Sequence, residues 1–349
     1  MPSGPTVIAV GAVGQDFDRD AVLWRISGLD SSPAVEVEPQ GGSGEEVMFG
    51  VAISGDAGFA AVGFRQPTPP PGDTDAAAWV STGGPAQIVT EGLSAEGYQK
   101  MNRVTAGPNG ELVAVGNVGP GYGEGATPLP TDAAAWISTD GGSSWSRNGD
   151  EGLAKDGYQE MRSATAFGGG FVAVGYDAKD AAVWLSDGAV WSQLVGQSSL
   201  VATGELVDLE MRDVTSWPGG LVGVGMVETS DGDENGAVWL STDGKTWTLV
   251  ANEEALGGEG DQRLLGVAAG DFGFVAVGCS GCRGDAVTPV VWTSVDGLTW
   301  TRTDGDRLPS QGSAGELSAI TVVGSTLVAA GWEEGPSDQD AAVWTARLP

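Results

Sequence analysis

A glycine-terminated apolar run recurs seven times along this 349-residue chain, and it constrains the fold more than any other feature. Each run is followed, after a loop, by a second short apolar run that ends in tryptophan, as in FVAVG at 171–175 and AAVW at 181–184. A repeat made of short β-like runs and Gly-rich turns is typical of the blades of a β-propeller. The closing glycines lie at intervals of 52, 53, 59, 50, 53 and 53 residues: Gly11, Gly63, Gly116, Gly175, Gly225, Gly278 and Gly331.

Each repeat divides into four expected strands, here lettered A to D, separated by turn-forming residues. In the fourth repeat these strands are expected at 161–167, 171–176, 181–186 and 190–195. The sequence therefore predicts an all-β fold, a seven-bladed β-propeller with four-stranded antiparallel blades. The chain starts on a B strand and ends on a C strand, which gives 26 strands in total. Either the first and last blades are three-stranded, or residues upstream of Met1 were trimmed from the natural protein.

We expect a single domain over residues 1–349, because the repeat continues from end to end. The repeat units are expected near 1–45, 46–100, 101–160, 161–210, 211–262, 263–315 and 316–349.

Eleven of the 13 tryptophans occupy repeated positions, which favours a role in packing between blades. Seven of them end the C-strand runs: Trp24, Trp79, Trp136, Trp184, Trp239, Trp292 and Trp344. Four more open the D strands: Trp145, Trp191, Trp247 and Trp300.

The turns between the C and D strands share a short motif, seen in STDGGSSW at 138–145, STDGKTW at 241–247, SVDGLTW at 294–300 and SDGAVW at 186–191. This motif resembles the Asp-box of BNR-repeat propellers such as the sialidase superfamily. Asp140, Asp243 and Asp296 are expected to accept backbone N–H bonds within their turns, while the glycine takes positive φ and the tryptophan fills the space between blades. The resemblance implies the architecture, since Asp-boxes lie on the face away from that family's active site.

The catalytic motifs of sialidases have no counterpart here. Those enzymes carry a Phe/Tyr-Arg-Ile-Pro segment near the start, whereas Arg25 is followed by Ile26 and Ser27. The same repeated phrase is similar to that of uncharacterised actinobacterial secreted repeat proteins. The resemblance therefore extends to the fold and not to the sialidase reaction.

Composition excludes several functional classes. There is no histidine, so triads, general bases and metal sites that depend on histidine are excluded. The formal charge of −31 argues against nucleic acid or an anionic membrane as a partner. No apolar run is long enough to insert into a membrane.

The variable loops between B and C strands and between D and A strands are the expected place of a binding site, because they vary on a constant scaffold. The residue after each closing glycine changes from repeat to repeat, and four of these residues are candidate ligand contacts: Phe64, Asn117, Tyr176 and Trp332. Two arginines near the start of A strands, Arg162 and Arg212, are candidates for holding an anion. The alternative is that each arginine pairs with an adjacent acid, Glu160 or Glu210.

Two further groups of residues allow either a binding or a structural interpretation. The near-identical loops at 91–101 and 151–161 carry Tyr98 and Tyr158, which either form an aromatic platform or fold their own loops against the blades. The run DFDRD contains Asp16, Asp18 and Asp20, weak candidates for Ca²⁺ ligands. No other cofactor is expected. An aspartate precedes the C run in five repeats, which favours a backbone-capping role: Asp20, Asp75, Asp132, Asp180 and Asp340.

Cys279 and Cys282 lie in a loop, CSGCRG, and are expected to form a local disulfide. This bond would indicate an oxidising compartment, so we expect a secreted or cell-surface protein whose signal segment is absent from this chain.

The leading functional hypothesis is a non-catalytic, monomeric propeller that binds a carbohydrate or a protein partner through the face formed by the B–C and D–A loops. The first alternative is a glycoside hydrolase or lyase that uses paired carboxylates in the central funnel. The second alternative is an assembly or scaffold subunit.

Overall fold

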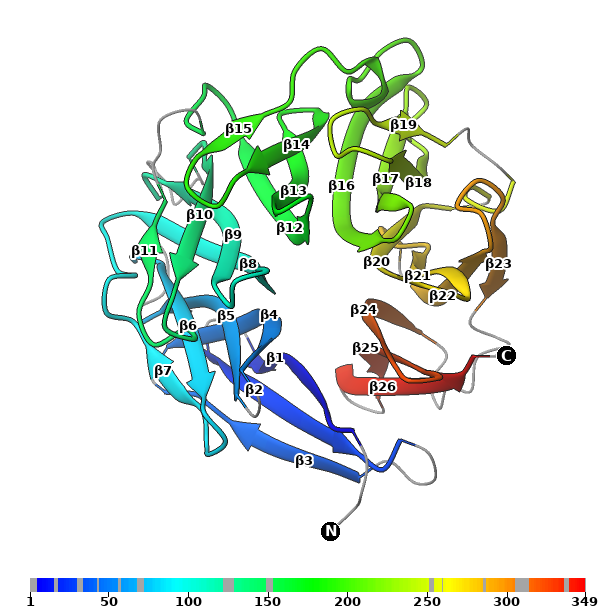
Figure 1. The fold of residues 1–349 in the computed structure, drawn as a ribbon. Coiled ribbons are helices and arrows are strands. Elements are labelled where there is room, and N and C mark those ends of the chain that lie inside the picture. The colour runs from blue at the N-terminus through cyan, green and yellow to red at the C-terminus, as the bar shows by residue number, and fades with distance from the viewer. Residues whose placement is uncertain are drawn as a thin grey trace. The chain divides into compact units, whose positions relative to one another are not determined.

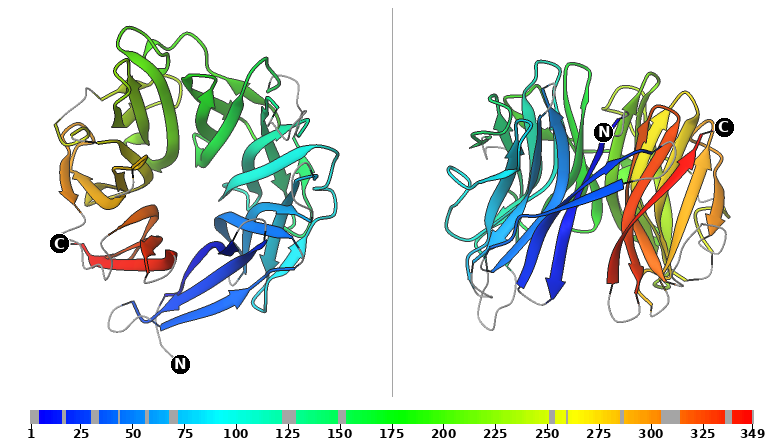
Figure 2. Two further views of the ribbon diagram at one scale, coloured as in Figure 1. Left: turned by 180° about the vertical axis from the view of Figure 1, so that it is seen from behind. Right: turned by 90° about the horizontal axis from the view of Figure 1, so that it is seen from below.

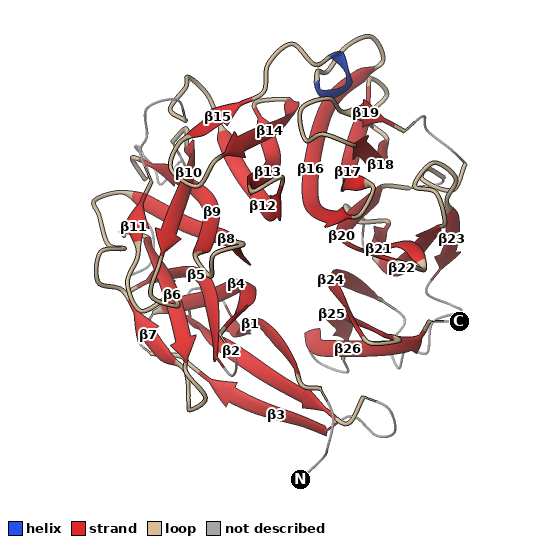
Figure 3. Cartoon of the chain, in the orientation of Figure 1, coloured by secondary structure: helices blue, strands red, loops and turns tan. Residues whose placement is uncertain are grey.

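In the computed structural model, the regular secondary structure of the described residues is almost entirely β-strand (Figure 3). The only helix drawn is the single turn η2, Ser198–Leu200. The structure describes residues 5–15, 18–29, 34–42, 44–55, 58–67, 72–121, 129–148, 153–250, 254–258, 260–284, 287–304, 314–335 and 339–348. Within these ranges, no helix combines the length and the apolar character that crossing a membrane requires.

The described strands form seven antiparallel sheets, numbered here as blades 1 to 7 along the chain (Figure 1). Blade 1 contains β1 (Val7–Gln15), β2 (Asp18–Ser27) and β3 (Ala34–Pro39). Blade 2 contains β4 (Glu45–Ser54), β5 (Gly58–Gln66), β6 (Asp75–Ser81) and β7 (Gln87–Val89). Blade 3 contains β8 (Tyr98–Ala106), β9 (Leu112–Gly119), β10 (Asp132–Ser138) and β11 (Ser146–Arg147). Blade 4 contains β12 (Gln159–Phe167), β13 (Gly170–Asp177), β14 (Asp180–Ser186) and β15 (Trp191–Gln193).

The remaining three blades follow the same order of strands. Blade 5 contains β16 (Leu206–Trp217), β17 (Gly220–Thr229), β18 (Glu234–Ser241) and β19 (Thr248–Leu249). Blade 6 contains β20 (Gln262–Gly270), β21 (Gly273–Ser280), β22 (Thr288–Ser294) and β23 (Thr301–Asp304). Blade 7 contains β24 (Gly315–Val323), β25 (Thr326–Glu334) and β26 (Gln339–Arg347).

The fold is the predicted seven-bladed β-propeller, with three strands in the first and last blades and four in each of the others. The predicted total of 26 strands is confirmed for the described residues. The repeat made this count possible because each blade carries its own turn signals. In Figure 2, β26 is red and forms an edge of its three-stranded sheet.

Backbone contacts divide the chain into two compact units. The first unit comprises residues 1–173 and 183–193, and the second comprises residues 174–182 and 194–349. The boundary passes through blade 4. The assignment of one domain to residues 1–349 stays a prediction.

The cores lie between neighbouring blades and are built around the repeated tryptophans. Between blades 2 and 3, Trp136 and Trp145 are buried among alanine and valine side chains of both sheets. Between blades 5 and 6, Trp292 and Trp300 occupy the equivalent places. The small residues of the AVG and AAW runs leave room for these indoles, which pack among them.

The Asp-box turns are held by their own aspartates, as the motif predicts. Asp243 Oδ1 accepts N–H bonds from Lys245 and Thr246 at 2.8 and 2.7 Å. Asp296 Oδ1 accepts equivalent bonds from Leu298 and Thr299, both at 2.8 Å. These bonds lower the pKa of both carboxyls because they stabilise the ionised form. Asp140 does the same through Ser144, whose backbone N–H lies 2.9 Å away.

Candidate functional site

The first strand of the blades carries a β-bulge at one recurring position. The register shifts after Met48 in β4, Met101 in β8, Met211 in β16, Leu264 in β20 and Leu317 in β24. The pairing register skips one residue at each shift: Phe49, Asn102, Arg212, Leu265 and Ser318. Arg162 follows Met161 in the same sequence position. A bulge re-aims its side chain, and the first strand of a blade borders the channel of a propeller, so these residues are candidates for contacting a ligand.

The closing glycines are required by this bulge. A Cβ atom on Gly116 would overlap the backbone carbonyl oxygen of Lys100, the residue before Met101. The same clash recurs between Gly225 and the carbonyl of Glu210, and in three further blades at Gly63, Gly278 and Gly331. The glycine that defines the repeat is therefore the position where strands A and B approach each other most closely.

In the first unit, the bulge region contains an ion cluster centred on Glu160. The Oε1 atom of Glu160 lies 2.7 Å from Lys100 Nζ and 3.5 Å from Arg162 Nη1. Asn102 Nδ2 donates to the same oxygen at 2.7 Å and to the carbonyl of Met161 at 2.8 Å. Burial of Glu160 opposes its ionisation, but the two cations and the hydrogen bonds outweigh burial and lower its pKa to about 2. Glu160 is therefore an ionised anchor for the three side chains around it.

An aromatic side chain that the sequence analysis missed lies next to this cluster. The Phe49 ring is 42% exposed, and Lys100 Nζ lies 5.6 Å from its centroid. The ring of Phe64 packs against Phe49 at a centroid distance of 5.8 Å. Aligning Met48–Phe49 with Met101–Asn102 and Met161–Arg162 would have identified Phe49, since the repeated feature is the residue after the methionine or leucine.

Two of the candidate residues that follow the closing glycines are buried and do not face solvent. Phe64 and Asn117 are only 8% and 4% exposed, and Asn117 Oδ1 has no hydrogen-bond partner among the described residues. Asn117 pairs across the sheet with Lys100 of β8, so it lies directly behind the ion cluster. Phe64 and Asn117 thus support the residues at the bulges. Tyr176 and Trp332 are partly exposed and belong to the second unit.

The duplicated tyrosine loops have a duplicated structure. Gln99 Nε2 donates to the Glu96 carbonyl at 3.3 Å, and Gln159 Nε2 donates to the Asp156 carbonyl at 3.2 Å. Leu93 and Leu153, at equivalent positions, are both buried. These bonds favour the interpretation that the loops fold against their blades. Tyr158 remains 44% exposed.

Two of the aspartates before the C runs cap backbone groups, as expected. Asp132 Oδ1 accepts from Lys155 N at 3.0 Å, and Asp180 Oδ1 accepts from Ala202 N at 2.8 Å. In each case the bond holds the following D–A loop against the blade.

In the second unit, the charged residues at the blade ends form ion pairs. Arg212 Nη2 lies 2.8 Å from Glu210 Oε2, the adjacent acid anticipated for it. Arg263 Nη2 donates to Glu234 Oε1 at 2.8 Å. Arg212 and Arg263 therefore each contact a glutamate. Arg162 and Arg212, the two candidate anion-binding arginines, belong to different units.

The disulfide loop contributes a further arginine to the second unit. Cys279 and Cys282 are joined by a disulfide with a Cα–Cα distance of 5.6 Å. Arg283, the next residue, lies 2.8 Å from Asp261 Oδ1 and 3.3 Å from Glu234 Oε1. The hydrogen bond from Arg283 lowers the pKa of Asp261. The disulfide thus holds the loop from which Arg283 reaches the acids of blade 5 and the start of blade 6.

The calcium hypothesis gains no support from the described part of the chain, where no group of three or more His, Cys, Asp or Glu residues is arranged to hold a metal ion. Asp16 lies outside the described residues. Arg19, between Asp18 and Asp20, forms an ion pair with Glu45. A cation already occupies this acidic region.

Comparison with known proteins supports the fold and not a particular activity. No protein-family model matches the chain, and no curated protein matches it. A protein of unknown function from Dyadobacter fermentans DSM 18053 is similar in structure, with a TM-score of 0.54, 12% identity, and coverage of 96% of this chain and 85% of that chain. A putative 6-phosphogluconolactonase from Bacteroides uniformis ATCC 8492 has a TM-score of 0.51 and 10% identity, covering 98% and 96%.

A second putative 6-phosphogluconolactonase, from Bacteroides fragilis NCTC 9343, has a TM-score of 0.50 and 12% identity, covering 99% of this chain and 96% of that chain. At these identities the similarity is one of fold alone. The Asp-box likeness of the turns remains a resemblance.

Proposed function

We propose that this protein is a non-catalytic binding propeller that holds a carbohydrate at the bulged residues of blades 2 to 4, on the face of the B–C and D–A loops. The observation that carries the proposal is the half-exposed ring of Phe49 beside the Lys100–Glu160 ion cluster. Phe49, Asn102 and Arg162 are the proposed ligand contacts, and Arg212, Tyr176 and Trp332 are proposed contacts of the second unit.

The chemistry of this cluster suits a sugar. An exposed aromatic ring offers an apolar surface to the C–H face of a pyranose, while nearby ammonium and guanidinium groups donate hydrogen bonds to hydroxyl or carboxylate oxygens. Glu160 fixes these donors in place because it is buried and ionised. Donors that are already positioned lose little freedom on binding, which favours affinity.

Glu160 itself is unsuited to general acid catalysis. A catalytic acid works best with a pKa near the operating pH, whereas the pKa of Glu160 is about 2. The best-defined carboxylate near Phe49 therefore supports a binding role over a hydrolytic one.

A glycan array probed with the labelled full chain tests the proposal, followed by calorimetry on any sugar that binds. We expect Phe49→Ala to weaken binding by at least about tenfold, because aromatic anchors dominate such contacts. Ile88→Ala is the matched control, since Ile88 is a similarly exposed apolar residue at 46%, in the last strand of the same blade. No binding to any glycan, or equal loss in both variants, would contradict the proposal.

One observation favours the hydrolase alternative in the second unit. Asp208 lies directly across the sheet from Glu228, and burial together with the charges of Glu210 and Glu228 raises the pKa of Asp208. A carboxyl with a raised pKa beside a second acidic side chain is the arrangement of a general acid and its partner. Release of a chromogenic group from aryl glycosides, abolished by Asp208→Asn, would establish this alternative in place of a purely binding role.

We further propose that the protein acts outside the cytoplasm as a monomer. The Cys279–Cys282 disulfide supports this location, because such bonds persist in oxidising compartments. Mass spectrometry of the non-reduced protein from its native cells tests it, and two alkylatable thiols would contradict it. A protein partner or a scaffold role would instead be indicated by co-purification that Phe49→Ala leaves unchanged.

A further inference from the structure

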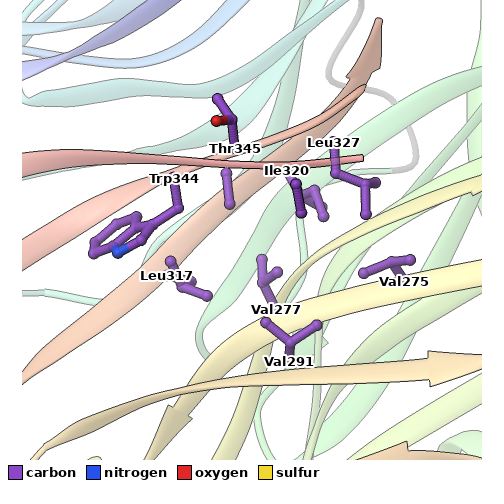
Figure 4. A pocket seen from close by; sticks show the side chains of 10 residues that line it. Val275, Val277, Val291, Leu317, Ile320, Leu327, Trp344 and Thr345 are labelled. Carbon is purple, nitrogen blue, oxygen red and sulfur yellow. The ribbon is translucent and has the colours of Figure 1, made fainter. Parts of the chain in front are cut away.

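An apolar cavity of about 130 Å³ lies between blades 6 and 7 (Figure 4). Strands β21 and β22 supply three valines to its wall, and blade 7 supplies larger side chains, among them Leu317, Ile320 and Trp344. Its lining is Val275, Val277, Val291, Leu317, Ile320, Leu327, Ala329, Trp344, Thr345 and Ala346. A cavity of this size with an apolar lining can accept a small aromatic group.

The preceding pair of blades shows what normally fills this space. Between blades 5 and 6, the Asp-box tryptophan of blade 6, Trp300, is buried to 3% exposure. By place in the repeat and by cross-strand pairing, eight of the ten lining residues have a counterpart in the cluster that contains Trp300. Val222, Val224 and Val238 of blade 5 correspond to Val275, Val277 and Val291 of blade 6. Leu264, Val267, Phe274, Ala276 and Trp292 of blade 6 correspond to Leu317, Ile320, Leu327, Ala329 and Trp344 of blade 7.

The cavity lies beside a blade with three described strands. The sheet β24–β25–β26 has no fourth strand among the described residues, and so no Asp-box tryptophan. Trp344 is consequently only partly buried, whereas its counterpart Trp292 is 0% exposed. Among the described residues, no further strand pairs with the outer edge of β26, and such an edge is a template for another strand.

We propose that this cavity and the edge of β26 form a docking site for an extended segment of a partner chain that carries an Asp-box tryptophan. The indole would fill the cavity as Trp300 fills its equivalent, and the following residues would pair with β26. The register follows from blade 6, where Thr301 pairs with Thr293 and Arg302 pairs with Trp292. The residue two places after the donated tryptophan would therefore pair with Trp344.

A folded second copy of this chain cannot supply that tryptophan. All four Asp-box tryptophans are already buried, with at most 5% exposure: Trp145, Trp191, Trp247 and Trp300. The donor is instead a strand that is free before docking, as in recognition by strand addition, where backbone bonds supply affinity and a pocket supplies specificity.

A peptide that copies the blade 6 hairpin, residues 294–304 (SVDGLTWTRTD), is the direct probe. Fluorescence anisotropy of the labelled peptide with the full chain should show saturable binding. The peptide with Trp300→Ala should bind at least about tenfold more weakly. A buried indole anchor contributes more binding free energy than a tenfold change in Kd requires.

A variant of the protein tests the location. Ala346→Trp places an indole at an exposed residue of the cavity wall, so it should block the peptide while leaving the circular dichroism spectrum of the chain unchanged. Val295→Trp, at an 86% exposed turn position, is the matched control and should leave binding intact. Equal binding of the two peptides, or no binding of either, overturns the proposal. So does a dimer that Ala346→Trp dissociates, because the occupant would then be a second copy of this chain.

Discussion

Glu160 Oε1 lies 2.7 Å from Lys100 Nζ, and this contact joins the first strands of blades 3 and 4. The glutamate is 4% exposed, while the lysine side chain is 15% exposed. Asn102 reaches the same carboxylate oxygen from β8. A buried ion with several hydrogen-bonded partners stabilises the fold only while it stays charged. The free energy of unfolding of the first unit should therefore depend on pH through this contact.

Glu160→Gln should lower the free energy of unfolding, and the loss should depend on pH. The pKa of Glu160 is about 2 in the folded protein, below its ordinary value of 4.5. A lowered pKa contributes stability that is complete above pH 4.5 and is lost as the pH falls through 2. We expect a difference between wild type and variant of about 3 kcal/mol at pH 7, falling to roughly 1 kcal/mol at pH 3. Urea unfolding at both pH values measures it.

Asp304→Asn is the control for this experiment. Asp304 also forms an ion pair, with Arg302, but its side chain is 54% exposed and the pair is solvated. Its removal should cost less than about 1 kcal/mol at either pH. A difference for Glu160→Gln that is the same at pH 3 and pH 7 would show that the loss comes from packing and not from charge.

Gly116→Ala should be among the most damaging single-methyl changes in the chain. The added Cβ would overlap the carbonyl oxygen of Lys100, and backbone atoms on both strands of the bulge would have to move. We expect a loss of about 3 kcal/mol, at the upper end of the range for overpacking. Gly84→Ala is the matched control, because a Cβ there meets nothing within 4 Å. Thermal unfolding of the two variants compares them, and equal melting temperatures would show that the bulge yields easily.

Most of the architecture could be predicted because the same strand and turn patterns recur in all seven repeats. A single run such as FVAVG is ambiguous, but seven runs at one period, each followed by a tryptophan-ended run, specify blades. The missing strands of the first and last blades followed from the same alignment. The turns of Asp243 and Asp296 were predictable as well, because an Asp-box is held by bonds within five residues.

The candidate site was harder to predict because it depends on the bulge. The sequence marks the residues after the closing glycines, such as Asn117, as candidate ligand contacts, which stays a prediction. In the structure the residue at the bulge after Met48, Phe49, is 42% exposed, whereas Asn117, which pairs with Lys100, is 4% exposed. A bulge changes the alternation of apolar and polar residues at a single position only. The sequence alone therefore gave no reason to select Phe49 as a candidate.

Reduction of the Cys279–Cys282 disulfide should change stability only slightly. The bond closes a loop of four residues, and the loss of chain entropy in the unfolded state is correspondingly small, at most about 2 kcal/mol. The contacts of Arg283 with Asp261 and Glu234 should keep the loop in place. Urea unfolding with and without a reductant measures the change. A larger loss, or one that Arg283→Ala reproduces, would show that the loop orders more of blade 6 than its own residues.

Trp292 and Trp344 offer a matched pair for measuring what the fourth strand contributes to a blade. Trp292 is 0% exposed and its Nε1 donates to the Ala255 carbonyl at 2.7 Å, whereas Trp344 is partly exposed and borders the cavity between blades 6 and 7. Trp292→Ala should cost about 3–5 kcal/mol, because it opens a new cavity and removes a hydrogen bond. Trp344→Ala should cost less than about half as much, since part of its indole already lacks neighbours. Urea unfolding followed by circular dichroism compares the two variants. Equal losses would mean that the cavity beside Trp344 is closed in solution, and that the space beside β26 is already filled.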